Sequence, residues 1–320
     1  MKRSWWVASV AGVLVVAVAA VLIAWKLSGE PDGSGPGPAT TATSEKTAAP
    51  ERRAVLAVKI DNVAAARPQT GLSAADLVYV EPVEGGLTRL LALYWNRPPT
   101  VIGPVRSARA TDLTLLTQYG KPTLAYSGAA PELLPSLHSA SLVNGSPAES
   151  PNAYFRDDGR PSPHNLYLHP EQVPDSEPVP VNALPEAGPA PEAGAPASAA
   201  TIRFPAASFA FTWSAQAGRW LISLDGSPLT STGAGQVGTA TVVEQRVAVR
   251  LGERGETGTV PNSPIARTIG GGQATVWRDG KRFPAVWERA NEQAPTRFRT
   301  TSGQPLPVAD GPLWILLVPA

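Results

Sequence analysis

The chain has 320 residues, of which 43% are hydrophobic and 17% are charged, and its net charge is +1 with a pI of about 8.0. This near-neutral balance argues against a nucleic-acid partner, which requires a basic surface. The sequence contains no cysteine, so disulfide bonds, thiolate metal sites and lipid attachment through a cysteine are excluded.

The first predicted element is a membrane-spanning helix. No residue from Trp5 to Trp25 is charged, and as a helix this stretch would extend ~31 Å, the thickness of a bilayer's hydrocarbon core. Lys2 and Arg3 precede it, which places the N-terminus in the cytoplasm and the body of the chain outside. We therefore predict a cytoplasmic tip and a single-pass signal anchor in the cell membrane over residues 1–27. A cleaved signal peptide is the alternative, because small residues occur within the stretch.

Two segments rich in proline, glycine and alanine divide the rest of the chain. Residues 28–50 hold few large apolar side chains, too few to offset the conformational entropy lost on folding, so they predict a disordered stalk. Residues 173–200 predict a linker. These boundaries define an N-terminal domain over residues 51–172 and a C-terminal domain over residues 201–320.

The N-terminal domain alternates predicted strands with predicted helices. Short apolar runs bounded by charges or turn residues predict strands at residues 54–60, 77–81, 87–95 and 121–126. Helical spacing and end signals predict helices at residues 111–119 and 131–138. Gly85 and Gly86 permit a tight connection between the second and third strands, which predicts a hairpin. This alternation predicts a mixed α/β domain.

The C-terminal domain consists mainly of predicted strands, at residues 209–213, 219–224, 240–250, 274–278 and 313–318. Asp279-Gly280 is a strong hairpin signal. The predicted fold class is α+β: a mixed α/β N-terminal domain followed by a smaller β-rich C-terminal domain, preceded by one transmembrane helix. We assign the tryptophans of this region to packing, with a carbohydrate-binding surface as the alternative; they are Trp213, Trp220, Trp277, Trp287 and Trp314.

Several motifs occur in a characteristic order between residues 58 and 169. They are Ile60-Asp61-Asn62, Ala66-Arg67-Pro68-Gln69-Thr70-Gly71-Leu72, Val83-Glu84-Gly85-Gly86, Ile102-Gly103-Pro104-Val105-Arg106-Ser107-Ala108-Arg109 and Pro163-His164-Asn165-Leu166-Tyr167. In these motifs the chain resembles the N-terminal domain of the YerB-like bacterial envelope lipoproteins, a family of unknown function. The C-terminal region is similar to that family's companion domain through Arg278-Asp279-Gly280-Lys281 and Gly311-Pro312-Leu313-Trp314-Ile315.

The resemblance implies an architecture and an envelope location, but no activity. Lipidated members of the family are held at the membrane by a cysteine. Because this sequence has none, we expect the transmembrane helix to take its place.

The same motifs concentrate arginines and acids. Arginine forks suit bidentate binding of phosphate or carboxylate, and carboxylates can balance them or hold magnesium. Histidine adds a group that titrates near neutral pH. We predict a site for an anionic, oxygen-rich ligand, with no catalytic residue, resident metal or cofactor assigned. Its members are Asp61, Asn62, Arg67, Asp76, Glu84, Arg89, Arg106, Arg109, His164 and Asn165. Each arginine could equally serve a structural ion pair.

The leading functional hypothesis is a membrane-anchored extracytoplasmic binding or scaffold protein. Its partner would be a cell-wall polymer or a lipid-linked envelope component, and residues 5–25 would contact the membrane. A fainter similarity in motif order, to the LytR-CpsA-Psr ligases, offers the alternative of a magnesium-dependent glycopolymer phosphotransferase. Ala74 and Ser107 depart from that pattern, because those enzymes would have a charged residue and an aspartate there.

Overall fold

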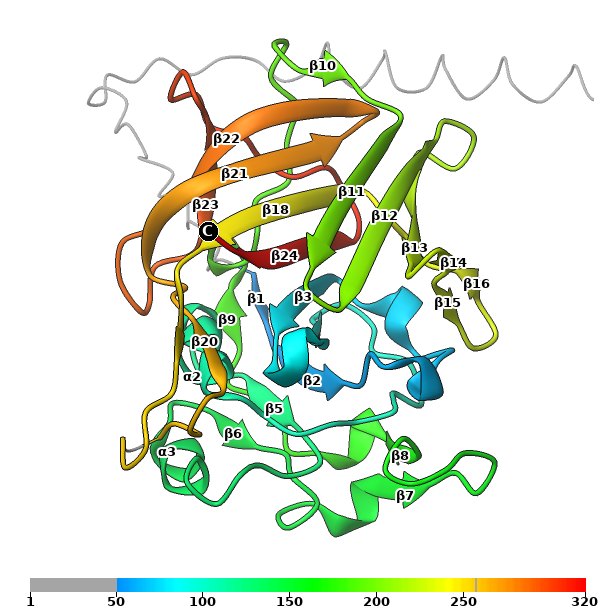
Figure 1. Cartoon of the computed structure of the whole chain (residues 1–320), viewed down its shortest axis with the longest axis vertical. Coiled ribbons are helices and arrows are strands. Elements are labelled where there is room, and N and C mark those ends of the chain that lie inside the picture. Colours follow the sequence, from blue (N-terminus) through cyan, green and yellow to red (C-terminus); the bar gives the residue numbers. More distant parts are fainter. Residues whose placement is uncertain (1–50, 257) are drawn as a thin grey trace, which may run out of the picture. The chain divides into compact units, whose positions relative to one another are not determined.

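The computed structural model (Figure 1) describes residues 51–256 and 258–320, and strands are far more frequent than helices in this part of the chain. The predicted cytoplasmic tip, transmembrane anchor and stalk fall within residues 1–50 and so lie outside the described residues. Among the helices of the described part, none combines the length and the hydrophobicity needed to cross a bilayer.

Both halves of the described chain contribute strands to one main sheet of eleven strands. In spatial order these are β10 (Ala195–Pro196), β22 (Lys281–Arg289), β21 (Gly270–Arg278), β18 (Thr241–Val247), β24 (Leu313–Pro319), β3 (Leu77–Pro82), β4 (Thr88–Tyr94), β2 (Leu56–Ile60), β5 (Thr123–Ala125) and β6 (Val143–Asn144), with β23 (Arg297–Thr300) paired to β22. The last strand, β24, lies parallel to β3 with Leu313 opposite Leu77. This pairing joins the N-terminal and C-terminal halves through backbone hydrogen bonds.

A second, five-stranded sheet packs beside the main one (Figure 1). It contains β11 (Ala199–Phe204), β12 (Ala207–Ser214), β13 (Arg219–Leu224), β14 (Ser227–Pro228) and β17 (Gly238–Thr239). The remaining strands of the described residues form pairs: β1 (Arg52–Arg53) with β9 (Val179–Pro180), β7 (Tyr154–Arg156) with β8 (Leu166–Leu168), β15 (Thr230–Ser231) with β16 (Gly235–Gln236), and β19 (Val249–Leu251) with β20 (Pro264–Ala266).

Helices in the described part are short. The α-helices are α2 (Ala110–Leu116) and α3 (Leu134–Ser139), and the 3₁₀ turns are η1 (Ala64–Ala66), η2 (Leu72–Ala74), η3 (Glu84–Gly86), η4 (Thr117–Tyr119), η5 (Pro151–Ala153), η6 (Pro170–Gln172) and η7 (Val181–Ala183). The segment predicted as a linker, residues 173–200, carries β9, η7 and β10.

The predicted α+β class, with its mixed α/β N-terminal domain, is wrong. The structure is mostly β, with 43% of the described residues in strands and 13% in helices. The strands and helices of the N-terminal half do lie near their predicted positions. However, α2 and α3 have seven and six residues, which is too short to cover a large sheet. The central strands β2, β3 and β4 pair antiparallel, unlike the parallel core of an α/β domain.

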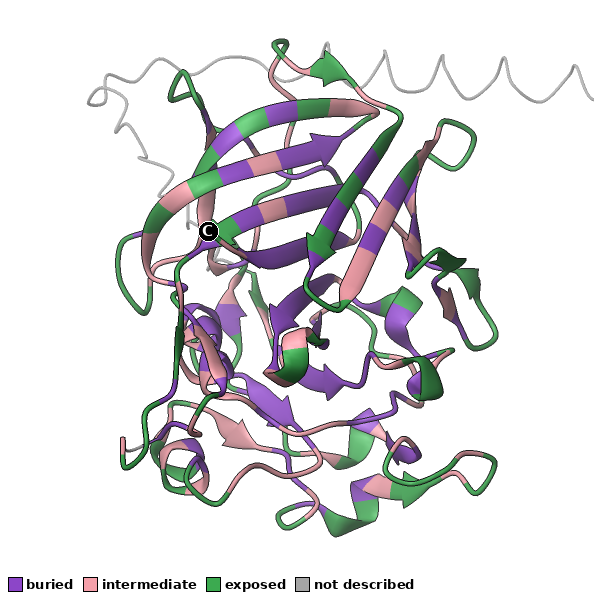
Figure 2. Cartoon of the chain, in the orientation of Figure 1, coloured by how far each residue is buried: buried purple, intermediate pink, exposed green. Residues whose placement is uncertain are grey.

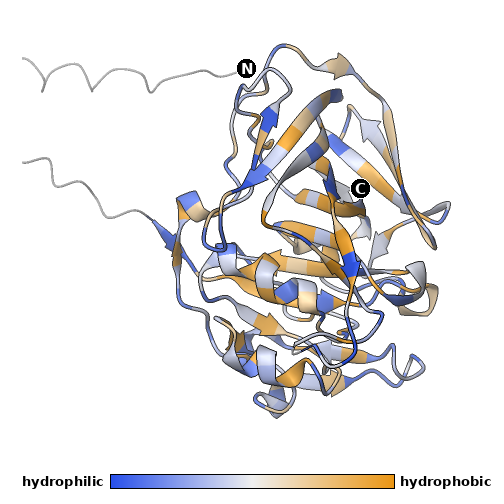
Figure 3. Cartoon of the chain, turned by 60° about the vertical axis from the view of Figure 1, so that its left-hand side comes forward, coloured by the Kyte–Doolittle hydropathy of each residue, from blue (hydrophilic) through white to orange (hydrophobic). Residues whose placement is uncertain are grey.

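Two hydrophobic clusters cover opposite faces of the main sheet. Along β3, Leu77 and Tyr79 belong to one cluster and Val78 and Val80 to the other, because successive strand residues point to opposite faces. Figure 2 shows the central strands buried along their length, and Figure 3 shows hydrophobic residues concentrated there. Double-sided burial explains why these strands read as continuous apolar runs. The packing role predicted for Trp220, Trp277, Trp287 and Trp314 is confirmed, because all four are buried.

Both predicted hairpins are confirmed. Asp279 and Gly280 connect β21 to β22 with φ angles of 53° and 68°, the left-handed conformation of a tight two-residue turn. Gly85 and Gly86 have φ angles of 69° and 72° in the connection between β3 and β4.

Candidate functional site

Strand register brings charged residues to one end of the central strands. Glu81 on β3 lies opposite Arg89 on β4. The pairing of β2 with β4 ends with Ile60 opposite Leu90, so the next residue, Asp61, falls opposite Arg89. Motifs that are 28 residues apart in the sequence therefore meet across three adjacent strands.

The carboxylate of Asp61 is the centre of the cluster and is completely buried. Its Oδ1 accepts hydrogen bonds from Nη1 of Arg89 at 2.8 Å and from the backbone N–H of Asn62 at 2.9 Å. Its Oδ2 lies 2.7 Å from Nδ1 of His164 and 3.0 Å from Nε of Arg106. Because an ionised carboxylate only accepts, we assign a proton to Nδ1 of His164, which leaves Nε2 facing away from Asp61. We call Asp61, Arg89, Arg106 and His164 the Asp61 site.

The two arginines of the Asp61 site differ in exposure. Arg89 is 6% exposed, and burial lowers its pKa, while the charge of Asp61 acts in the opposite direction. The side chain of Arg106 remains 26% exposed. Its Nε approaches Asp61 without hydrogen-bond alignment, and its two Nη atoms donate no hydrogen bond within the described residues. Arg106 therefore presents unused donors at the surface.

Arg109 and Glu84 form a separate pair beside the Asp61 site. Nε and Nη2 of Arg109 donate to Oε2 of Glu84 at 3.2 and 2.8 Å, and Oγ of Ser263 donates to Oε1 at 2.5 Å. Partial burial acts to raise the pKa of Glu84, but these hydrogen bonds outweigh it and lower the pKa to about 2. Arg109 is therefore neutralised locally, and the hydrogen bond from Ser263 to Glu84 connects the two halves of the chain.

A buried ionic cluster adjoins these residues and was missed by the sequence analysis. Nζ of Lys59 donates to Oε2 of Glu81 at 2.6 Å and to Oδ1 of Asp112 at 2.8 Å, and none of the three side chains is more than 1% exposed. Oδ2 of Asp112 accepts the backbone N–H of Arg109 at 2.7 Å, which links this cluster to the pair above. The sequence did contain a signal for this cluster, because Lys59 and Glu81 are charged residues inside strands that are otherwise apolar.

The buried cluster predicts a pH dependence of stability. Burial and the nearby charge of Asp112 together raise the pKa of Glu81 to about 8, although Lys59 acts in the opposite direction. A carboxyl group with a higher pKa in the folded state contributes stability below its unfolded value of 4.5 and loses it as the pH rises through about 8. Between about pH 5 and about pH 8 we expect the urea midpoint of the wild-type protein to fall relative to that of Glu81→Gln. Parallel pH profiles for the two proteins would contradict this assignment.

Two further predicted residues lie next to the Asp61 site. Nδ2 of Asn62 donates to Oγ1 of Thr88 at 2.7 Å. Nη2 of Arg67 donates to the backbone carbonyl of Asn62 at 2.9 Å and to Oδ2 of Asp225 at 2.8 Å. Arg67 thus connects the loop after β2 to the turn between β13 and β14.

The other two predicted residues have different partners. Asn165 follows His164, but its Oδ1 accepts from Nη1 of Arg156 at 2.6 Å. Asp76 precedes β3, at the end of the strand opposite to Glu81, and its Oδ2 accepts the backbone N–H groups of Trp95 and Asn96 at 2.8 and 3.1 Å. The geometry gives Asp76 a structural role in closing the end of β4.

Family models match both halves of the chain. Residues 40–178 match "Protein of unknown function (DUF3048) N-terminal domain", and residues 200–315 match the corresponding C-terminal domain. The chain belongs to the DUF3048 family. Together with the relative and the solved structure described next, this match confirms the resemblance to YerB-like proteins inferred from the motifs. Every residue of the Asp61 site lies within the N-terminal DUF3048 match.

A curated relative and a solved structure support the same family. "Putative lipoprotein YerB" of Bacillus subtilis (strain 168) is 39% identical over 119 residues, which cover 37% of this chain and 35% of that protein. The sequence alignment thus spans about a third of the relative's length. The crystal structure of the Bacillus subtilis YerB protein matches with a TM-score of 0.70 at 22% identity, over 84% of this chain and 92% of that chain. At this identity, the likeness shows a shared fold.

Proposed function

We propose that this DUF3048 protein is a membrane-associated protein of the cell envelope that binds an anionic, oxygen-rich ligand at the Asp61 site. The ligand class is a cell-wall polymer or a lipid-linked envelope component. An envelope location is supported by the name of the relative, a lipoprotein, and by the uncharged stretch over residues 5–25. That stretch would serve as the anchor in a sequence without cysteine.

The charge balance of the Asp61 site carries this proposal. Arg89 and Arg106 share the single carboxylate of Asp61, which leaves an excess of one positive charge. Arg109 does not add to it, because Glu84 neutralises it. The unused Nη atoms of the partly exposed Arg106 suit an incoming phosphate or carboxylate oxygen.

His164 supplies a second polar group at the same place. Asp61 orients its ring through Nδ1, and its side chain is 20% exposed. Within the described residues, Nε2 makes no hydrogen bond. A ligand oxygen or hydroxyl that reaches Arg106 would therefore meet a fixed imidazole beside it.

The geometry favours binding over the magnesium-dependent phosphotransferase. A metal ligand must offer free lone pairs, and three of the about four lone-pair sites of the buried Asp61 carboxylate already accept hydrogen bonds. The remaining site, on Oδ2, lies beside the guanidinium of Arg106, whose positive charge would repel magnesium.

The proposal is tested by calorimetric titration of the purified full chain with inorganic pyrophosphate and with a polyprenyl pyrophosphate analogue. Removal of a charge-assisted contact typically costs about 1.5–3 kcal/mol, so we expect Arg106→Ala to weaken binding by roughly tenfold or more. The matched control is Arg97→Ala, an exposed arginine in the loop after β4. Equal affinities of wild type and Arg106→Ala, or no binding to either probe by folded protein, would overturn the proposal.

A further inference from the structure

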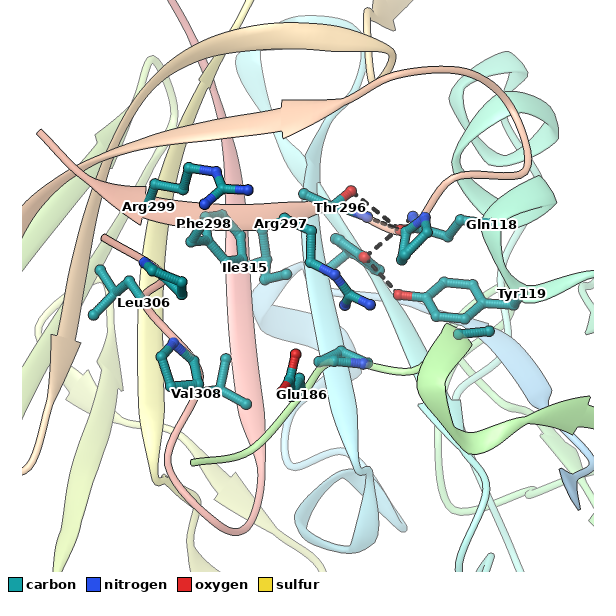
Figure 4. Close-up of a pocket in the computed structure, with 16 residues that line it drawn as sticks. Gln118, Tyr119, Glu186, Thr296, Arg297, Phe298, Arg299, Leu306, Val308 and Ile315 are labelled. Atoms are coloured by element: carbon teal, nitrogen blue, oxygen red, sulfur yellow. Dashed lines mark hydrogen bonds between the residues drawn. The ribbon is translucent and has the colours of Figure 1, made fainter. Parts of the chain in front are cut away.

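A second candidate site lies in a cavity of about 240 Å³ that shares no lining residue with the Asp61 site (Figure 4). Five separate parts of the chain line it: β3, η4, residues 183–186, residues 295–308 and β24. The cavity therefore exists only in the folded chain. Its volume is below the ~300–1,000 Å³ of ordinary small-molecule sites, so an occupant must be small.

One side of the cavity is polar, but its polar groups already form hydrogen bonds with one another. The hydroxyl groups of Tyr79 and Tyr119 lie 2.7 Å apart, and both residues are 1% exposed. Burial raises the pKa of Tyr79 to about 12, so this pair stays uncharged. Oε1 of Gln118 accepts the backbone N–H and Oγ1 of Thr296 at 3.0 and 3.1 Å. These groups hold the wall in place and carry no charge for a ligand to neutralise.

Another side of the cavity is apolar and stiff. Phe298, Leu306, Val308 and Ile315 line it, and all four are buried. Proline rings at residues 185, 295, 305 and 307 restrict the surrounding backbone. A preformed apolar wall lowers the entropy lost when an apolar side chain binds.

Two opposite charges line the same cavity without pairing. Arg297 is half-buried on β23, and its Nη2 donates to the backbone carbonyl of Asn182 at 3.0 Å. Within the described residues its Nε and Nη1 donate no hydrogen bond. The exposed Glu186 lies on the facing segment, and no salt bridge joins it to Arg297 in the part of the chain described. Figure 4 shows the side chain of Arg297 reaching down from β23 toward that segment.

We propose that this cavity binds a small zwitterion with an apolar side chain, the chemistry of a free α-amino acid. The guanidinium of Arg297 would take the ligand carboxylate, and the carboxylate of Glu186 would take its ammonium group. The side chain would pack on Phe298 and Leu306. An anion alone would leave Glu186 without a counter-charge, and a cation alone would leave Arg297 without one.

The test is titration of the purified full chain with L-leucine, D-leucine, leucinamide and N-acetylleucine, followed by saturation-transfer NMR. Leucinamide lacks the carboxylate, and N-acetylleucine lacks the ammonium group. We expect one leucine enantiomer to bind, and both blocked analogues to bind at least about tenfold more weakly, because each leaves a charged protein group unpaired.

Charge-removing variants assign the two contacts. Arg297→Gln is expected to lower the affinity for leucine about tenfold and to abolish the preference for leucine over leucinamide. Glu186→Gln should abolish the preference for leucine over N-acetylleucine. Arg203→Gln, which changes an exposed arginine on β11, is the matched control.

Three results would overturn the inference: neither enantiomer binds, the blocked analogues bind as well as leucine, or both variants keep the wild-type affinity and preference. Arg106→Ala is expected to leave leucine binding unchanged. The leucine experiments therefore test this cavity independently of the anion binding proposed for the Asp61 site.

Discussion

Asp61→Asn is expected to lower the free energy of unfolding by about 3–5 kcal/mol, the range for breaking a buried ion pair by removing one partner. The substitution keeps the shape of the side chain but removes its charge. Arg89, which is 6% exposed, would then be buried without a counter-ion, and His164 would lose the acceptor for its Nδ1 proton. Equilibrium urea unfolding of the purified protein measures the effect.

The matched control for this prediction is Asp158→Asn, which removes an exposed carboxylate from the connection between β7 and β8. It should change stability by less than about 0.5 kcal/mol. A similarly small effect of Asp61→Asn would show that Arg89 finds another counter-charge or water, and the central role of Asp61 would be wrong.

Lys59→Met is expected to be comparably destabilising, again by about 3–5 kcal/mol at neutral pH. Methionine retains most of the chain length and apolar stem of lysine but leaves the carboxylate of Asp112 buried without its cation. Glu81, with a pKa of about 8, is mostly protonated at neutral pH and ionises above it. The loss measured by urea unfolding should therefore be larger at about pH 9 than at about pH 7, because Lys59 then also balances an ionised Glu81 in the wild type.

Lys121→Met provides the comparison for Lys59→Met. Lys121 pairs with Glu177 at 3.3 Å, but their side chains are 45% and 72% exposed. Exposed pairs contribute about 0–1 kcal/mol, so this variant should unfold almost as the wild type does. If the two lysine variants lose the same stability, the buried cluster does not have the structural role assigned to it.

Local chemistry was sufficient to locate much of the secondary structure. The Asp279-Gly280 turn appears where the sequence signal lies, since only a few residue types tolerate two successive left-handed positions. The apolar runs at β2, β3 and β4 were equally clear, because these strands are buried on both faces. The fold class failed because α2 and α3, although found, are too short to form a helical layer.

For the candidate site, too, the sequence identified residues, whereas the structure showed which of them are in contact. Asp61, Arg89, Arg106 and His164 were named from their motifs, but nothing local showed that they would share one carboxylate. Asp76 was named with them because it has the same chemistry, yet its position at the other end of β3 makes it a structural acceptor. Lys59 was missed because one charge inside an apolar strand is informative only when its buried partners are known.

By itself, the sequence determined the absence of cysteine chemistry, the near-neutral charge, the strand positions and the motifs that mark the family, because each depends on residue type or short-range spacing. The tertiary structure decided which charges meet. The pairing of β24 with β3 and the register of β2, β3 and β4 depend on hydrogen bonds between residues far apart in the chain. Whether Arg106 is left with free donors while Arg109 is neutralised follows from that packing, which no short stretch of sequence contains.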